Sequence, residues 1–331
     1  MAWGPGIEVN QIMRLLVTGG AGFIGSNFIH YILEKHPDYE IINLDALTYA
    51  GSLDNLKEVM DNTQHRFIQG SIEDGEVVEQ AMIGIDVVIN FAAESHVDRS
   101  IVEPQVFIKT NVLGTQVLLN AALRHKVKLF NQISTDEVYG ALELDSTMSF
   151  TEESPLRPNS PYAASKAAAD LLAQSYFRTY GLPIVISRCS NNYGPRQHPE
   201  KFIPTVILNA LRDMPIPIYG DGLYVRDWIH VLDHCQAIDM ILEKGGVGEI
   251  YNISADNERV NIELAREILR IMGKPETLLQ SVADRPGHDR RYALDSSRIK
   301  RELGWKPQYA FEVALSKTID WYRQNTGYQT K

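Results

Sequence analysis

Short apolar runs alternate with amphipathic stretches through the first half of the chain. Each run is short enough to be a buried strand, and the runs occupy 14–18, 41–44, 66–69, 87–91 and 128–133. Helical spacing of apolar residues occurs after the first run and again over 74–82 and 105–125. This alternation predicts an α/β fold, a Rossmann-type doubly wound parallel sheet.

The first apolar run ends at a glycine-rich turn that opens a helix. Gly19 permits the tight turn, Gly22 lets the backbone approach a pyrophosphate, and Gly25 lets the helix pack close to the strand. The second run ends at Asp45, about 20 residues further on, where a carboxylate can accept hydrogen bonds from ribose hydroxyls. An acid there repels a 2′-phosphate. Glycines alone would also suit a surface turn, but the combination predicts an NAD site.

The pattern changes after an apolar run at 184–187. Pro-rich turns follow, with helical patterns at 262–272 and 310–322. We expect residues 13–188 to form the NAD-binding domain, to which later segments can return, and 189–331 to form mainly a smaller mixed α/β substrate domain. Residues 1–12 have no clear periodicity and are predicted to be a disordered leader or tag.

Composition narrows the classes of function. With 32 Lys and Arg against 42 Asp and Glu, the formal charge of −10 argues against a nucleic-acid surface, although a local basic pocket for an anionic small ligand stays open. The two cysteines, Cys189 and Cys235, lack metal-type spacing and suit a reducing cytoplasm. No apolar run is expected to reach the ~20 residues that span a bilayer. We predict a cytoplasmic protein with no metal and no membrane association.

A tyrosine and a lysine open the helix predicted at 161–179. Ser160 is a plausible N-cap, Pro161 suits the first turn, and Tyr162 and Lys166 project from one face because they are four residues apart. The ordinary pKa of tyrosine is about 10, so we expect a desolvated site in which Lys166 and the nicotinamide charge favour the phenolate. A solvated helix pair is the alternative. Behind a nucleotide-binding turn, the pair predicts alcohol oxidation, with Thr135 hydrogen-bonding the substrate hydroxyl.

The chain resembles a known family from about Met13 to its C-terminus. The glycine turn, Asp45, Asn111 and the pair Tyr162 and Lys166 are similar to the extended short-chain dehydrogenase/reductase family. The resemblance implies the Rossmann-type fold, NAD as cofactor and a nucleotide-sugar substrate. Members of the family dimerise through a pair of helices, which here correspond to 105–125 and 161–179.

These two helices are apolar or alanine-rich on more than one face, which indicates burial on more than one side. A homodimer through a helix bundle is therefore expected.

The segment from Ser134 to Gly140 carries a second chemical device. Its Thr-Asp-Glu triplet resembles the nucleotide-sugar dehydratases of the family, in contrast to its epimerases and simple dehydrogenases. By resemblance, Glu137 removes the C5 proton that a C4 ketone makes acidic, and Asp136 protonates the departing C6 hydroxyl. Neighbouring carboxyls suit this task because close like charges split their pKa values. An ordinary acidic loop is the alternative.

The resemblance implies the complete set of site residues. The catalytic residues are Thr135, Asp136, Glu137, Tyr162 and Lys166. The cofactor contacts are Gly19, Gly22, Phe23, Ile24, Gly25, Asp45, Leu47, Thr48, Ser71, Ile72, Ala92, Ala93, Ser95, Thr110, Tyr162, Lys166 and Asn191. The substrate contacts are Ser95, Thr135, Asn191, Asn192, Lys201, Phe202, Ile203, Pro204, Pro217, Ile218, Tyr219, Arg226, Asn261, Asp284, Arg285 and His288.

Three of these positions carry specific expectations. Arg226 and Arg285 are expected to clamp a diphosphate, since guanidinium binds phosphate oxygens bidentately. Ser71 stands where relatives often have an aspartate for the adenine amino group, and a hydroxyl accepts that bond more weakly than a carboxylate. We therefore expect NAD affinity, and not cofactor identity, to be affected.

Other functions stay open from the sequence. Another nucleotide-sugar enzyme of the family, such as a 4-epimerase, a decarboxylase or a dehydratase for a different nucleotide, is the nearest alternative. A 4-epimerase would leave Asp136 and Glu137 without a task. A non-catalytic NAD-binding sensor is the alternative from another class, but a sensor needs neither Tyr162 nor Lys166 as a hydride-transfer base.

Overall fold

A seven-stranded parallel sheet forms the centre of the molecule in the computed structural model, which describes residues 13–328; the leader predicted at 1–12 lies outside them. Its strands are β1 (Arg14–Thr18), β2 (Glu40–Asp45), β3 (His65–Gln69), β4 (Val87–Asn90), β5 (Leu129–Thr135), β6 (Ile184–Cys189) and β10 (Ile250–Ile253). Their order is β10-β6-β5-β4-β1-β2-β3 and every neighbouring pair is parallel. The predicted doubly wound Rossmann-type sheet is confirmed.

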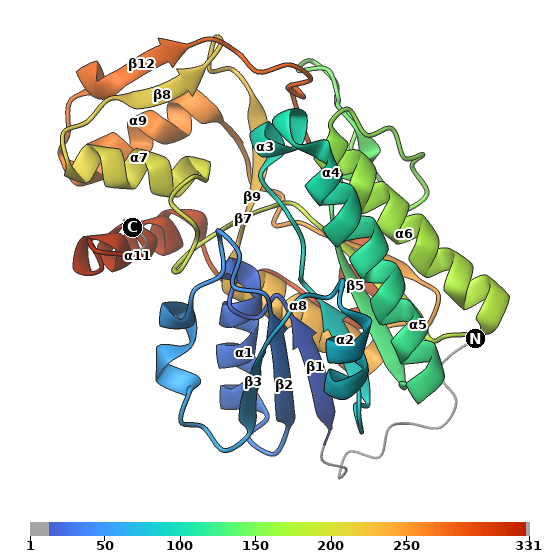
Figure 1. The fold of residues 1–331 in the computed structure, drawn as a ribbon. Helices are drawn as coiled ribbons and strands as arrows, with labels where there is room; N and C mark the ends of the chain where they lie inside the picture. Colours follow the sequence, from blue (N-terminus) through green and yellow to red (C-terminus); the bar gives the residue numbers. More distant parts are fainter. Residues whose placement is uncertain (1–12, 329–331) are drawn as a thin grey trace.

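Both faces of the sheet are covered by helices, as Figure 1 shows. Leu15 and Val17 of β1 join one core with helices α1 (Phe23–Lys35) and α8 (Val231–Lys244). Leu16 joins the opposite core, which contains side chains of α2 (Gly75–Ala81), α5 (Thr115–His125) and α6 (Pro161–Tyr180). Successive strand residues point to opposite faces, so the short, continuous apolar runs follow from burial on both sides.

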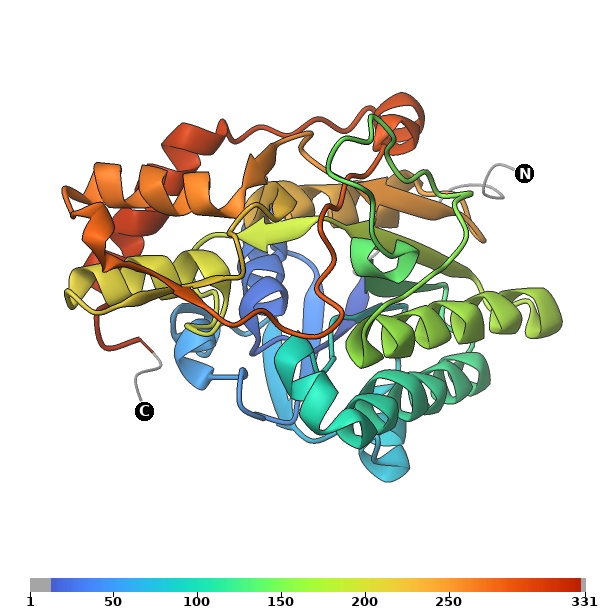
Figure 2. The ribbon, with the colours of Figure 1, turned by 90° about the horizontal axis from the view of Figure 1, so that it is seen from above.

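The helix predicted at 105–125 is a composite. It consists of α4 (Pro104–Phe107), a π-helical turn η2 (Ile108–Gly114) and α5, and it follows the short helix α3 (Val97–Val102). Figure 2 shows α5 beside α6, in agreement with their packing contacts. A π-helical turn inside a helix often marks a functional position.

The stretch Pro104–His125 is long and apolar enough to cross a membrane by length and composition, which corrects the expectation that no apolar run reaches that length. In its most apolar window, 44% of the residues are buried inside the molecule. The core helix of a soluble protein passes the same test, so this feature is weak evidence for a membrane span.

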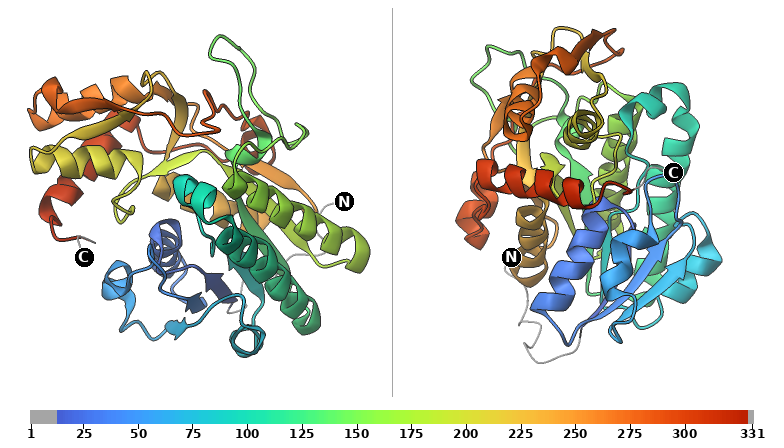
Figure 3. Two further views of the ribbon diagram at one scale, coloured as in Figure 1. Left: turned by 45° about the horizontal axis from the view of Figure 1, so that its top comes forward. Right: turned by 90° about the vertical axis from the view of Figure 1, so that its left-hand side faces the viewer.

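A smaller region lies beside the large sheet, and Figure 3 shows its helices at 202–211, 261–272 and 311–324 in yellow, orange and red. It holds two small sheets, β11-β9-β7 and β12-β8, and the predicted helices at 262–272 and 310–322 are present. Its elements are β7 (Asn191–Tyr193), α7 (Phe202–Leu211), β8 (Ile216–Tyr219), β9 (Val225–His230), β11 (Glu258–Val260), α9 (Asn261–Met272), η4 (Glu276–Leu278), β12 (Leu279–Val282) and α11 (Phe311–Gln324). A separate apolar core, with Ile207, Ile268 and Leu315 at its centre, holds it together.

The chain crosses between the two regions more than once after residue 189. Helix α8 packs on α1, and β10 pairs with β6 at the edge of the large sheet. Helix α10 (Ser297–Leu303) packs on β10 and α8. The sheet therefore takes its edge strand, β10, from the part of the chain after residue 189.

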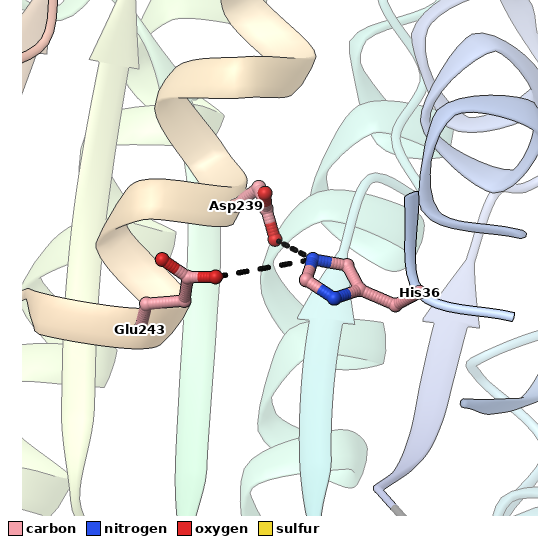
Figure 4. Close-up of side chains that lie close together, drawn as sticks. All are labelled: His36, Asp239 and Glu243. Atoms are coloured by element: carbon pink, nitrogen blue, oxygen red, sulfur yellow. Dashed lines mark hydrogen bonds and ion pairs between the residues drawn. The ribbon is translucent and has the colours of Figure 1, made fainter. Parts of the chain in front are cut away.

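A polar cluster, drawn in Figure 4, joins the end of α1 to α8. His36 Nε2 lies 2.9 Å from Asp239 Oδ1 and 3.9 Å from Glu243 Oε1. The three side chains are close enough to hold a metal ion. However, the ammonium of Lys35 already binds the second oxygen of Asp239, so the charge of this buried carboxylate is balanced. We interpret the cluster as a tie between two helices.

Candidate active site

One cavity joins the glycine-rich turn to the predicted reactive residues at the carboxyl ends of the parallel strands. It is lined by all five predicted catalytic residues and by every predicted cofactor contact except Leu47. Among the predicted substrate contacts, it is lined by Ser95, Thr135, Asn191, Asn192 and Lys201. Ligands of open parallel sheets bind at this edge, so these residues form the candidate active site.

The glycine turn leaves no room for side chains. A Cβ at Gly25 would lie 2.3 Å from the Gly19 carbonyl oxygen, and one at Gly19, where φ is +70°, would lie 2.7 Å from the Ala92 nitrogen. The turn therefore presents bare backbone at the N-terminus of α1, where unpaired N–H groups and the helix dipole favour an anion. The cradle fits the pyrophosphate of a dinucleotide.

Asp45 braces this turn from the end of β2. Its Oδ2 accepts a hydrogen bond from Ala21 N at 2.9 Å and its Oδ1 accepts one from Leu47 N at 2.8 Å. Burial raises the pKa of Asp45, and these two backbone donors oppose the shift. A carboxylate has about four acceptor sites, so Asp45 can still accept from a ribose. Leu47 contributes its backbone to this arrangement and does not line the cavity.

Ser71 and Glu73 form the far edge of the cavity. The Ser71 hydroxyl accepts a hydrogen bond from Glu73 N at 3.1 Å, and Thr110 Oγ1 donates to the Glu73 carboxylate at 2.7 Å. Glu73 is not among the predicted cofactor contacts. It places a carboxylate two residues beyond the position where relatives often have one.

Tyr162 and Lys166 face the cavity from the first turns of α6. Ser160 caps the helix as predicted, accepting from Ala163 N at 3.1 Å, and both reactive side chains are buried. Burial, and then the charge of Glu137, raise the pKa of Tyr162 well above its ordinary value. Acidic groups surround the phenol.

Lys166 is held at the end of β5, and its influence on the phenol of Tyr162 stays a prediction. The Lys166 ammonium donates to the Ile133 carbonyl oxygen at 2.6 Å. Burial lowers the pKa of Lys166, whereas Asp170 and Cys189 raise it. The lysine is thus held by the end of β5.

Thr135, Asp136 and Glu137 lie at the exit of β5. The strand runs to Thr135, two residues beyond its predicted end, because Ser134 and Thr135 are polar but buried. Thr135 Oγ1 accepts from Glu137 N at 3.3 Å and donates to Asp136 Oδ1 at 3.2 Å. As the cap of the 3₁₀ turn η3 (Asp136–Tyr139), the threonine thus holds the carboxyl of Asp136 and the backbone of Glu137.

The two carboxyls differ in environment. Burial, and then the charge of Glu137, raise the pKa of Asp136 well above its usual range. Burial also raises the pKa of Glu137, but Arg285 and Arg226 oppose the shift. Within the described residues, Asp136 Oδ2 is buried and makes no hydrogen bond. Asp136 is thus the better proton donor and Glu137 the better base.

Asn111, in the π-helical turn, ties this site together. Its side-chain amide exchanges hydrogen bonds with the backbone of Glu94 at 2.9 and 3.0 Å and donates to Ser165 Oγ at 2.8 Å. The asparagine therefore connects the loop after β4 to the helix that carries Tyr162 and Lys166.

Several predicted substrate contacts lie outside the cavity lining, and the guanidinium groups of two of them have protein partners. Arg285 donates to Asp98 Oδ1 at 3.0 Å, and Arg226 donates to the Asp289 carbonyl oxygen at 2.8 Å. Each guanidinium thus binds a protein oxygen, while the charges of both arginines oppose the rise in the pKa of Glu137 that burial causes; that they clamp a diphosphate stays a prediction. The residues outside the lining are Phe202, Ile203, Pro204, Pro217, Ile218, Tyr219, Arg226, Asn261, Asp284, Arg285 and His288.

Several polar residues of the cavity are not among the predicted contacts: Glu73, Glu94, Ser134, Cys189, Ser190, Gln197, His198 and Glu200. Glu94, Ser134 and Cys189 follow or end strands, where the sites of parallel sheets gather. His198 and Glu200 lie on an irregular loop, with His198 Nδ1 3.7 Å from Glu200 Oε2. No local pattern marks the latter pair.

The chain is similar to known proteins over nearly its whole length. A sequence model of the family described as GDP-mannose 4,6 dehydratase matches residues 16–318. The chain is 51% identical over 310 residues to the low-salt glycan biosynthesis protein Agl12 of Haloferax volcanii, with 94% of this chain and 98% of the relative covered. It is 51% identical over 318 residues to a dTDP-glucose 4,6-dehydratase of Streptomyces antibioticus, with 95% and 93% covered.

A solved structure of the dTDP-glucose 4,6-dehydratase DesIV of Streptomyces venezuelae, determined with NAD bound, superimposes with a TM-score of 0.93. The two sequences are 50% identical, and the match covers 96% of this chain and 98% of DesIV.

Proposed function

The chain belongs to the GDP-mannose 4,6 dehydratase family, and from that premise we propose that it converts dTDP-glucose to dTDP-4-keto-6-deoxyglucose with NAD as cofactor. The dTDP-glucose 4,6-dehydratases named above indicate the nucleotide of the substrate, and the NAD bound in DesIV indicates the cofactor. The observation that carries the reaction is the placement of Asp136 and Glu137 in the same cavity as Tyr162 and the glycine turn. A simple dehydrogenase or a 4-epimerase has no task for the two carboxyls.

Oxidation at C4 is the first step. Tyr162 removes the proton of the C4 hydroxyl, and Thr135 hydrogen-bonds the same oxygen. NAD, when bound in the glycine cradle, accepts a hydride from C4 and later returns it to C6. Lys166, held by the Ile133 carbonyl oxygen, supplies a positive charge close to the developing phenolate.

Loss of water is the second step. The C4 ketone makes the C5 proton acidic, and Glu137 removes it. Asp136 gives its proton to the C6 hydroxyl, which leaves as water, so a C5–C6 double bond forms. Asp136 Oδ2, buried and without a partner among the described residues, is the atom that carries this proton. Reprotonation at C5 completes the 4-keto-6-deoxy sugar, and no net oxidation occurs.

The direct test is incubation of the purified protein with dTDP-glucose, followed by alkali and measurement of the absorbance that 4-keto-6-deoxy sugars develop. UDP-glucose and CDP-glucose serve as parallel substrates. We expect product from dTDP-glucose at the highest kcat/KM. A 4-epimerized sugar without the chromophore, or no product from any of the three, would contradict the proposal.

A homodimer through the helices α5 and α6 is part of the same proposal. Large apolar side chains are exposed on this pair of helices and its π-helical turn: Ile108 is 52%, Leu113 47% and Leu171 56% exposed. Burying them against a second copy removes apolar surface from water. Light scattering should give the mass of a dimer at micromolar concentration, and Leu171→Glu should shift it toward the monomer. A wild-type monomer would refute this assembly.

A cytoplasmic location is proposed as well. Its support is that Cys189 and Cys235 are both buried free thiols, as expected where disulfides do not form. Fractionation of cells that express the protein tests the location, and recovery in the membrane fraction would contradict it.

A further inference from the structure

A buried polar network lies behind the candidate active site. Asp170 is completely buried on α6, and its Oδ2 accepts from Ser134 Oγ at 3.0 Å and from Arg188 Nε at 2.9 Å. Arg188 also donates to the Tyr139 hydroxyl at 2.9 Å, and Tyr139 donates to Asn252 Oδ1 at 2.8 Å. The network therefore holds both ends of the segment that carries Thr135, Asp136 and Glu137.

The position of Asp170 also relates it to the reactive helix residues. Tyr162, Lys166 and Asp170 are spaced by four residues on α6, so they share one face of the helix. The second oxygen of the carboxylate, Oδ1, is buried and makes no hydrogen bond within the described residues. An unpartnered buried carboxylate oxygen is unfavourable unless a nearby cation benefits from its charge. Arg188 is paired with the other oxygen, Oδ2, and Lys166, one helical turn earlier, is a second cation whose charged form Asp170 favours.

Charged and titratable groups from the neighbouring elements also act on Tyr162, Lys166 and Asp170. From the elements packed against α6, Cys189 of β6 influences both Tyr162 and Lys166, and Asp136 and Glu137 of η3 influence Tyr162. Arg188 of β6 donates to Asp170, and Tyr139 of η3 accepts from the same guanidinium. Burial lowers the pKa of Lys166, and the largest opposing influence is Asp170.

We propose that Asp170 is a positioning residue for C4 oxidation, which keeps Lys166 charged beside Tyr162 while its bonds to Ser134 and Arg188 anchor the dehydrating carboxyls. The inference rests on the proposed dehydratase function. Without the carboxylate, burial leaves Lys166 more readily neutral, and the phenolate of Tyr162 loses its nearby positive charge. The hydride step then becomes slower, whereas the surfaces that bind NAD and substrate are unchanged.

The test compares wild type with Asp170→Asn, using dTDP-glucose that carries deuterium or hydrogen at C4. Each pKa unit corresponds to a tenfold change in the fraction of the ionised base, so we expect kcat near neutral pH to fall by about tenfold or more. Both KM values should stay within about twofold. The deuterium isotope effect on kcat should increase, and the acidic limb of the kcat–pH profile should move to higher pH.

Asp239→Asn is the matched control, because Asp239 is equally buried and paired but lies at the tie between α1 and α8. It should lower stability and leave the isotope effect and the pH profile unchanged. Asp170→Glu, which retains the charge, should recover part of the rate. If Asp170→Asn shows the isotope effect and pH profile of the control, the proposal is overturned.

A second variant covers the case in which Asp170→Asn does not fold. Removing one partner of a buried ion pair costs about 3–5 kcal/mol, whereas removing both is often close to neutral. The double variant Asp170→Asn with Arg188→Met should fold and show the same larger isotope effect, and a wild-type isotope effect would refute the proposal. Absence of activity in the wild type would instead refute the dehydratase function itself.

Discussion

The residues around the glycine turn and those around β8 and β12 differ in what their polar groups contact. In the first region, Asp45 and the backbone of the turn hold one another in a shape that leaves lone pairs and N–H groups facing the cavity. In the second region, the Arg285 guanidinium and the Tyr219 hydroxyl both bind the carboxylate of Asp98, on α3. The cofactor side is thus arranged for binding, whereas the substrate side is engaged with the protein itself.

We therefore expect the cofactor side to bind NAD and the substrate side to bind the nucleotide sugar in different ways. A preformed site loses little conformational entropy when its ligand arrives. On the substrate side, a diphosphate that binds Arg285 as predicted would compete with Asp98 for the same guanidinium. The contact between α3 and the loop after β12 also bridges the two regions of the chain. Substrate binding should therefore respond to substitutions in this bridge that leave NAD binding unchanged.

The largest expected effect on activity comes from the two carboxyls of the active site, Asp136 and Glu137. Asp136→Asn and Glu137→Gln should each lower the rate of dehydration by about 10²–10⁴-fold, the usual contribution of a general acid or base. NAD affinity, measured by calorimetry, should not change. Glu143→Gln, an exposed acid on the following loop, is the control. Wild-type turnover in either active-site variant would remove these two carboxyls from the mechanism.

The pH dependence of these variants sharpens the assignment. The charge of Glu137 contributes to the raised pKa of Asp136, so Glu137→Gln should lower that pKa. Asp136 would then lose its proton at lower pH. The alkaline limb of the residual activity should move to lower pH than in the wild type, and a shift in the other direction would reverse the acid and base roles.

Much of the cofactor side could be predicted because its signals are local in sequence. The Gly19 turn, the strand ending at Asp45, the Ser160 cap and the spacing of Tyr162 and Lys166 all depend on neighbouring residues. Backbone geometry fixes their consequences. Ligands of open parallel sheets bind at the carboxyl ends of the strands, which is where these residues lie.

The features of the site that could not be predicted depend on contacts between residues far apart in the sequence. Apolar periodicity ended β5 two residues early, since the polar Ser134 is buried through its bond to Asp170, 36 residues away. Arg285 and its partner Asp98 are separated by 187 residues, so no local pattern reveals that the arginine is already paired. The bond of the Lys166 ammonium to the Ile133 carbonyl oxygen joins residues 33 positions apart, so the helix spacing of Tyr162 and Lys166 does not reveal it.

A smaller effect, on substrate binding, is expected from the loss of Arg285. Hydrogen bonds to charged groups contribute about 1.5–3 kcal/mol, so Arg285→Ala should raise KM for dTDP-glucose by about 10–100-fold, with little change in NAD affinity. Arg290→Ala is the matched control. Arg290 makes a two-bond ion pair with Asp221 at an exposed position, and its loss should leave KM within about twofold. Equal effects of the two substitutions would mean that Arg285 contributes only general surface charge.

The smallest effect is expected from Asp98→Asn, which tests whether the bridge between the regions competes with the substrate. The ion pair of Asp98 with Arg285 is partly exposed, with side-chain exposures of 34% and 23%, and such pairs contribute about 0–1 kcal/mol. Releasing Arg285 should therefore lower KM for dTDP-glucose by up to about fivefold and leave NAD affinity unchanged. Asp221→Asn, which releases Arg290 instead, should not affect KM. If Asp98→Asn raises KM, the carboxylate aligns Arg285 for the diphosphate, and the substrate side is as well prepared for its ligand as the cofactor side.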